Sequence, residues 1–67
     1  MLLRIMNETG HTELQVTESE VIEHITDHPT YWVFVDGEIT SREEINAVNW
    51  DSVEEVTLSP AVVGGSN

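Results

Sequence analysis

The run Thr30-Tyr31-Trp32-Val33-Phe34-Val35 is the feature that most constrains how this 67-residue chain can fold. Every residue in it is aromatic or β-branched, which is the composition of a strand. Asp36-Gly37 follows directly and favours a tight turn, so Glu38–Thr40 is predicted to be a short strand that leads back. A sheet that contains this hairpin needs a second layer to cover at least one of its faces.

The residues before this hairpin predict a second hairpin and a helix. Residues 1–6 form a short apolar run around Arg4, residues 7–10 suit a tight turn, and residues 11–16 alternate between apolar and polar side chains. Residues 17–20 read Thr-Glu-Ser-Glu, which matches a helix capping box, and the apolar residues that follow recur on one helical face. The helix is predicted to span about three turns and to end before Pro29.

The residues after Thr40 predict a short helix and a last strand. Ser41-Arg42-Glu43-Glu44 is a second capping box, which starts a brief helical turn, and Trp50 is expected to plug the edge of the core beneath this connection. An alternating pattern from Val53 predicts a strand that stops near Ser59, because the following proline cannot donate to a sheet ladder. Residues 1–60 are therefore predicted to form one domain, and residues 61–67 a flexible tail.

One sheet and one helix can bury a two-layer core, which leaves the other face of the sheet open. Strand alternation places Arg4, Met6, Trp32 and Phe34 on that open face. An exposed aromatic pair on an acidic protein would form a docking patch for a partner, whereas the alternative is that a loop or the tail covers Trp32. The predicted core consists of the inward-facing apolar residues: Leu3, Ile5, Leu14, Val16, Val21, Ile22, Ile25, Val33, Val35, Ile39, Ile45, Val56 and Leu58.

The charge of the chain is strongly negative. Thirteen Asp and Glu residues accompany two arginines and no lysine, which gives a formal net charge of −11. Such a surface repels nucleic acid and anionic lipid and favours basic partner surfaces, although an acidic excess can also serve solubility or a saline cytoplasm. We therefore expect neither a nucleic-acid partner nor a membrane partner.

The composition also bears on where the protein works. Cysteine is absent, which excludes disulfides, thiol nucleophiles and thiolate metal sites. The amino end shows no basic region followed by an apolar block, and apolar runs are only a few residues long. We expect a soluble, untargeted, cytoplasmic protein that packing alone holds together.

Neither metal binding nor catalysis is predicted from the polar residues. His24 and His28 lie one helical turn apart and could in principle bind a metal together with His11, but paired histidines near a helix end are more often a solvated pair favoured by the helix dipole. Adjacent carboxylates on a strand, such as Glu54 and Glu55, face opposite ways, which gives no support for acid–base catalysis. The chain carries no cofactor-binding motif.

The last residues combine an apolar arm with two adjacent glycines. Pro60-Ala61-Val62-Val63 is followed by Gly64-Gly65 and then by Ser66 and Asn67. Because glycine has no side chain beyond Cα, the pair could thread a channel too narrow for other residue types. The alternative is that these residues are a frayed terminus or a cloning remnant.

The predicted element order, together with four of these segments, resembles the β-grasp, ubiquitin-like family. The segments are the hairpin over 2–16, the helix after Thr17, the segment 33–38 and the closing segment 56–65. Within that family the chain resembles the prokaryotic sulfur-carrier proteins of thiamin and molybdopterin synthesis and the small archaeal modifier proteins. The resemblance implies an α+β fold, in which a mixed sheet of four to five strands packs on one helix in the order ββαββ(short helix)β.

The resemblance also implies that the protein is a monomeric substrate or carrier and not an enzyme. In the family, an ATP-dependent activating enzyme adenylates the terminal glycine carboxylate, and the acyl group becomes a thiocarboxylate or an amide to a target lysine. Carried over, Gly65 supplies the carbonyl, Gly64 gives access, residues 60–63 form the arm, and the open sheet face meets the partners.

Two features of the chain limit how the family's chemistry can apply. Ser66 and Asn67 follow Gly65, so a processing protease must first remove them. Any lysine joined to the protein must belong to another protein, and a sulfur-transfer partner would be the other acceptor. The second hypothesis is an acidic β-grasp interaction or inhibitor module whose tail has no chemistry.

Overall fold

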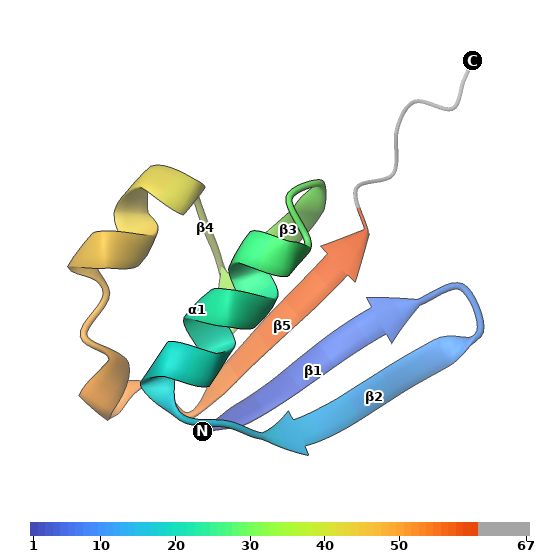
Figure 1. The fold of residues 1–67 in the computed structure, drawn as a ribbon, viewed down its shortest axis with the longest axis horizontal. Coiled ribbons are helices and arrows are strands. Elements are labelled where there is room, and N and C mark those ends of the chain that lie inside the picture. The colour runs from blue at the N-terminus through green and yellow to red at the C-terminus, as the bar shows by residue number, and fades with distance from the viewer. Residues whose placement is uncertain (61–67) are drawn as a thin grey trace.

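The computed structural model describes residues 1–60, which form a five-stranded sheet with one α-helix packed on one face (Figure 1). The elements follow the predicted order, and the α+β fold with a β-grasp layout is confirmed. Two short 3-10 helices, η1 and η2, stand where one brief helical turn was predicted. In chain order the elements are β1 (Leu2–Asn7), β2 (Gly10–Gln15), α1 (Glu18–Asp27), β3 (Tyr31–Val35), β4 (Glu38–Thr40), η1 (Arg42–Ala47), η2 (Trp50–Ser52) and β5 (Glu55–Pro60).

The last strand occupies the centre of the sheet. The strand order is β2-β1-β5-β3-β4, in which β5 runs parallel to β1 and antiparallel to β3. Both hairpins therefore depend on β5 to join them into one sheet, and β2 and β4 are left as the two edges. In Figure 1 the far end of β5 points to the same side of the molecule as the turn between β1 and β2.

The boundaries of β5 differ from the prediction at both ends. The strand begins at Glu55 and not at Val53, because the Val53 N–H donates to the Trp50 carbonyl and closes η2. The Glu54 carbonyl is the first group of this segment to reach β1, where it accepts from the Leu2 N–H at 3.0 Å. At the other end it includes Pro60, which pairs with Tyr31. The Tyr31 N–H donates to the His28 carbonyl at 3.0 Å and the Tyr31 carbonyl accepts from Arg42 Nη2 at 3.1 Å, so the residue opposite Pro60 does not require a donor from the proline.

The turn between β3 and β4 is confirmed and also fixes the start of β5. Asp36 and Gly37 both have positive φ angles, 50° and 86°, as the central positions of a tight hairpin require. The Asp36 carboxylate accepts hydrogen bonds from the N–H groups of Glu54 and Glu55 at 3.1 and 3.0 Å. One residue therefore closes the hairpin and holds the central strand in register.

Both predicted capping boxes are present. The Thr17 hydroxyl accepts from the Glu20 N–H at 3.3 Å, and the Glu20 carboxylate accepts from the Thr17 N–H at 2.9 Å. At η1 the Glu44 carboxylate accepts from both the N–H and the hydroxyl of Ser41, each at 3.1 Å. The bonds at α1 are reciprocal, whereas at η1 the Glu44 N–H donates to the Ser41 carbonyl at 3.0 Å. Both sets of bonds satisfy backbone donors at the start of a helix.

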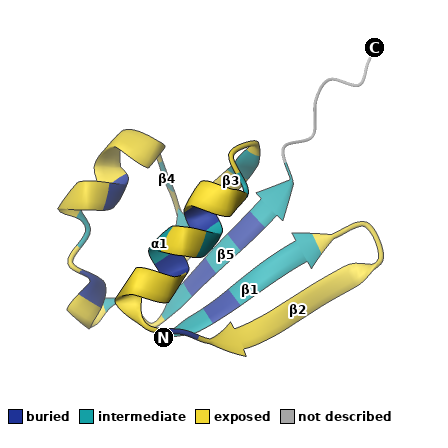
Figure 2. Cartoon of the chain, in the orientation of Figure 1, coloured by how far each residue is buried: buried dark blue, intermediate teal, exposed yellow. Residues whose placement is uncertain are grey.

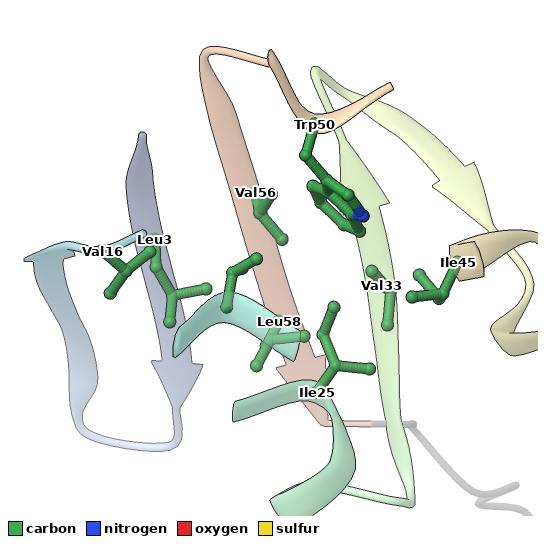
Figure 3. Packing of buried hydrophobic residues seen from close by; sticks show 9 residues of the cluster. Leu3, Val16, Ile25, Val33, Ile45, Trp50, Val56 and Leu58 are labelled. Atoms are coloured by element: carbon green, nitrogen blue, oxygen red, sulfur yellow. The ribbon is translucent and has the colours of Figure 1, made fainter. Parts of the chain in front are cut away.

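The core lies between α1 and the three inner strands, and it confirms most of the predicted residues (Figures 2 and 3). Trp50 is 6% exposed, and in Figure 3 its ring points from η2 toward Val56 and Val33, as expected of a plug at the core edge. Ile5, Ile22 and Val35 are partly buried against the core. The buried residues are Leu3, Val16, Val21, Ile25, Val33, Ile45, Trp50, Val56 and Leu58.

Two predicted core residues, Leu14 and Ile39, are exposed instead. Leu14 pairs with Leu3 and so faces the helix side, but it lies on edge strand β2, whose six residues are all exposed, and it is 37% exposed itself. Ile39 pairs with Phe34, which places it on the open face, where it is 55% exposed. The Asp36-Gly37 turn sets this register, and a shift of one residue would be needed to bury Ile39.

Among residues 1–60, no helix is both long enough and apolar enough to cross a membrane.

Replacing Leu58 with alanine should unfold much of the protein at ordinary temperature. Leu58 is fully buried on the central strand, and a buried Leu→Ala change costs about 2–5 kcal/mol, which is a large part of the stability of so small a domain. Leu14→Ala removes the same atoms from an exposed site and should cost under about 1 kcal/mol. Urea unfolding followed by tryptophan fluorescence measures both, and equal losses would contradict the assigned core.

Glu20 should contribute to stability in a pH-dependent way. The hydrogen bonds from the Thr17 N–H and then the Thr17 side chain hold the pKa of Glu20 below its ordinary value. A lowered folded pKa means that the contribution is present above the pKa of the unfolded chain and is lost as the pH falls through the folded pKa. Glu20→Gln keeps a capping side chain that does not titrate, so its deficit relative to the wild type should shrink on acidification. Denaturant unfolding of Glu20→Gln and of the wild type across the acidic pH range measures this deficit, and a deficit that does not change with pH would contradict the prediction.

Candidate functional site

The open face of the sheet carries one row of side chains that crosses all five strands. The strand register places Glu13, Arg4, Thr57, Phe34 and Ile39 side by side in that order, from β2 through β1, β5 and β3 to β4. The row changes character from one end to the other, because its β2 end is charged and its β4 end is apolar.

The charged half is organised around Arg4. Its Nε atom lies 3.2 Å from Glu13 Oε2 and its Nη1 atom 2.8 Å from Glu55 Oε2, which links β2, β1 and β5 across the sheet. His11 Nε2 lies 3.4 Å from the same Glu13 oxygen. These side chains are partly exposed, so each pair adds little stability, but Arg4, which we predicted as a partner contact, is already engaged within the chain.

The apolar half contains two of the predicted docking residues, Trp32 and Phe34 on β3, whereas Met6 and Arg4 lie on β1. Trp32 is 48% exposed, and no loop within residues 1–60 covers it, whereas Phe34 and Met6 are half-buried on the same face. The alternative in which the tail covers Trp32 concerns residues outside the described part of the chain. Ile39 joins this patch, and the prediction missed it, although the Asp36-Gly37 turn could have placed it opposite Phe34.

Arg42 holds the ends of α1 and β3 together. Its Nη1 atom donates to the Ile25 carbonyl at 2.7 Å, and its Nη2 atom donates to the Tyr31 carbonyl at 3.1 Å and to the His28 carbonyl. The last carbonyls of a helix carry partial negative charge, which compensates the guanidinium. The prediction gave Arg42 no role beyond its place in the second capping box, because its partners lie 11 to 17 residues away in sequence.

The arginines and the α-amino group therefore all form contacts within the chain. Arg4 and Arg42 are the only arginines, lysine is absent, and the α-amino group of Met1 donates to the Val16 carbonyl at 2.9 Å. The acidic side chains of the domain are in contrast mostly exposed. A partner consequently meets a surface whose available charges are negative.

The histidines do not form one cluster. The rings of His24 and His28 stack with centroids 6.3 Å apart, and His28 Nδ1 lies 2.7 Å from the His24 carbonyl oxygen. His28 also meets Tyr31 edge-on at 4.7 Å. His11 lies on β2 beside Glu13, on the open face and away from α1. Within residues 1–60, no three metal-ligating side chains gather closely enough to hold a metal ion.

Of the predicted conjugation arm, the structure describes only Pro60. It ends β5 beside Tyr31, and the preceding Ser59 pairs with Trp32. Ala61, Val62, Val63, Gly64 and Gly65, and with them Ser66 and Asn67, lie outside the described residues. The arm therefore starts next to the apolar half of the open face.

A scan against protein-family models, a search of curated proteins and a search of solved structures each found no match to this chain.

Replacing Arg42 with methionine should destabilise the fold more than the same change at Arg4. Arg42→Met keeps most of the side-chain stem but removes three charge-assisted bonds to backbone carbonyls, which corresponds to about 1–3 kcal/mol. Arg4→Met removes two exposed ion pairs and should cost no more than about 1 kcal/mol. Chemical denaturation of both variants gives the comparison, and an equal or larger loss at Arg4 would show that the Arg42 contacts contribute little.

Proposed function

We propose that the protein is a ubiquitin-like modifier or sulfur carrier, activated at Gly65 after the residues that follow it are removed. The observation that carries the proposal is the position of the di-glycine. Gly64 and Gly65 come four and five residues after Pro60, the last residue of the central strand of a sheet with β-grasp layout.

The length of the arm limits where an activating enzyme must bind. An extended chain spans at most about 3.5 Å per residue, so Gly65 can reach no further than roughly 18 Å from Pro60. The exposed apolar residue nearest to that end of β5 is Trp32, opposite Ser59. We propose that Trp32, Phe34 and Met6 contact the enzyme while the arm enters its active site.

In the proposed reaction this chain supplies a carboxylate and no catalytic group. The Gly65 carboxylate attacks the α-phosphorus of ATP, pyrophosphate leaves, and a sulfur nucleophile or a target-protein amine then displaces AMP from the acyl adenylate. A protease must first cut after Gly65, because an internal glycine has no free carboxylate. Activation by an ATP-dependent enzyme would place the protein in the cytoplasm.

A second function, a non-covalent acidic binding module, is favoured by the charge of the domain. Its net charge of −11 and its internally engaged arginines suit a basic partner, and the exposed Trp32 gives that partner an apolar contact. In this case the tail has no chemistry and the protein acts through its folded surface alone.

Intact mass spectrometry of the protein from its native cells separates the two functions. A species that ends at Gly65, together with a form in which sulfur replaces one carboxylate oxygen or a branched peptide on a target lysine, is the expected result. A mass that always includes Ser66 and Asn67, without adducts, would overturn the carrier proposal in favour of the binding module.

Replacing Gly65 with alanine should abolish the covalent products, because the added methyl group would clash with the walls of a channel that admits only glycine. The variant is best made in a chain that ends at residue 65, so that failed proteolysis cannot explain the loss. The matched control is the same chain with the natural Gly65, which should form product without processing. An undiminished yield from the alanine variant would mean that the di-glycine is not used.

A further inference from the structure

We infer that the free edge of β4, with the hollows on both sides of it, binds an extended, positively charged segment of a partner protein. The site consists of Ile39, Trp32, Glu38 and Glu44 and the surfaces between them. This inference uses only the folded domain, so it holds for the carrier and for the binding module alike.

The backbone of β4 offers a place for an added strand. In a two-residue hairpin the pair that closes the turn, here Val35 with Glu38, is hydrogen-bonded, and such pairs alternate along the ladder. The N–H and C=O groups of Ile39 therefore point away from β3, toward the free edge of the sheet. A peptide that lies along this edge can pair with both groups.

Two hollows flank β4 and can accommodate side chains of such a peptide. One has a volume of about 530 Å³ and is lined by Pro29, Tyr31, Trp32 and Ile39 among others. The other, of about 380 Å³, is lined by Val35, Ala47 and Val48. Ile39, Thr40 and Glu44 border both hollows, so the two meet along the strand. Side chains of an extended segment alternate between the two faces, and each hollow can take one apolar residue.

The charges around β4 decide what kind of segment fits. Glu38 begins the strand, and Glu44 borders both hollows. Arg42, which also lines the larger hollow, directs its guanidinium to three backbone carbonyls at the ends of α1 and β3. Glu44 Oε1 accepts from Ser41 at the start of η1, so the charged groups left for a ligand are the Glu38 carboxylate and the second carboxylate oxygen of Glu44. A segment with arginine or lysine next to apolar residues is complementary to them.

The other edge of the sheet is a weaker candidate. Strand β2 is longer than β4, but Leu14 is its one apolar residue. Its central carboxylate, Glu13, is already shared by Arg4 and His11. A second copy of the chain would bring Glu13 close to its own counterpart in a symmetric pairing centred there, and like charges placed opposite each other destabilise a sheet. The exposed tryptophan and isoleucine lie at the β4 edge instead.

The test is a titration of the full chain with a blocked peptide, Gly-Arg-Val-Val-Arg-Gly, whose adjacent valines face opposite sides of an extended strand, followed by amide chemical shifts in NMR. We expect shifts confined to residues of β3, β4 and η1, with saturation by about 2 mM, since only one residue of β4 presents outward backbone groups. The same peptide with glutamate in place of arginine should not bind, and added salt should weaken the arginine peptide.

Two variants at the site and one control variant test whether binding depends on the residues named above. Trp32→Ala should weaken binding by roughly tenfold, because it removes the aromatic wall of the larger hollow. Leu14→Ala, the matched change at the opposite edge, should leave binding within about twofold. Glu38→Gln, an exposed and conservative change, should weaken binding independently of Trp32. Absence of binding, shifts centred on β2, or shifts spread evenly over the acidic surface would each overturn the inference.

Discussion

The fold depends on the insertion of its last strand between two hairpins that do not otherwise pair. Strand β5 supplies the ladder to β1 on one side and to β3 on the other, and its buried residues Val56 and Leu58 lie at the centre of the core. The Asp36 carboxylate and the Glu54 carbonyl fix where this strand begins. The sheet is therefore complete only when residues 55–60 are in place, and the chain must leave the domain from the middle of the sheet and not from an edge.

The second constraint is the shortage of positive charge. A chain with thirteen acidic residues and two arginines could have left the arginines on the surface to reduce self-repulsion. Instead Arg4 links three strands. Arg42 links the end of α1 to the start of β3, where Tyr31 has no partner on β4. Both cations stabilise connections between elements that are distant in sequence, and the acidic residues remain available outside. The stability of the fold and the negative charge of its surface thus come from the same placement of charged residues.

The predictable features were the ones that neighbouring residues determine. The Asp36-Gly37 turn, both capping boxes and the burial of Trp50 follow from short motifs, and the element order follows from periodicity. Ile39 was misplaced although the Asp36-Gly37 turn is itself a local motif, because the pairing with Phe34 that this turn imposes was not carried through to the face on which Ile39 lies. Leu14 was misplaced because burial on an edge strand depends on how far α1 extends over the sheet. The Arg42 contacts were beyond sequence reasoning, since they join residues brought together only by the tertiary fold.

The proposed docking edge and the start of the proposed arm lie at one corner of the domain. Pro60 pairs with Tyr31, and Tyr31 and Trp32 line the larger hollow beside β4. A protein that holds this edge would have residue 65 within roughly 18 Å of Pro60, close to its own surface. Binding of the edge would then make entry of the arm an intramolecular event, and an intramolecular event proceeds at a high effective concentration even when the first contact is weak. A three-residue edge strand is consequently sufficient for docking if the arm supplies the second contact, whereas a module without tail chemistry would need a larger basic surface to reach the same affinity.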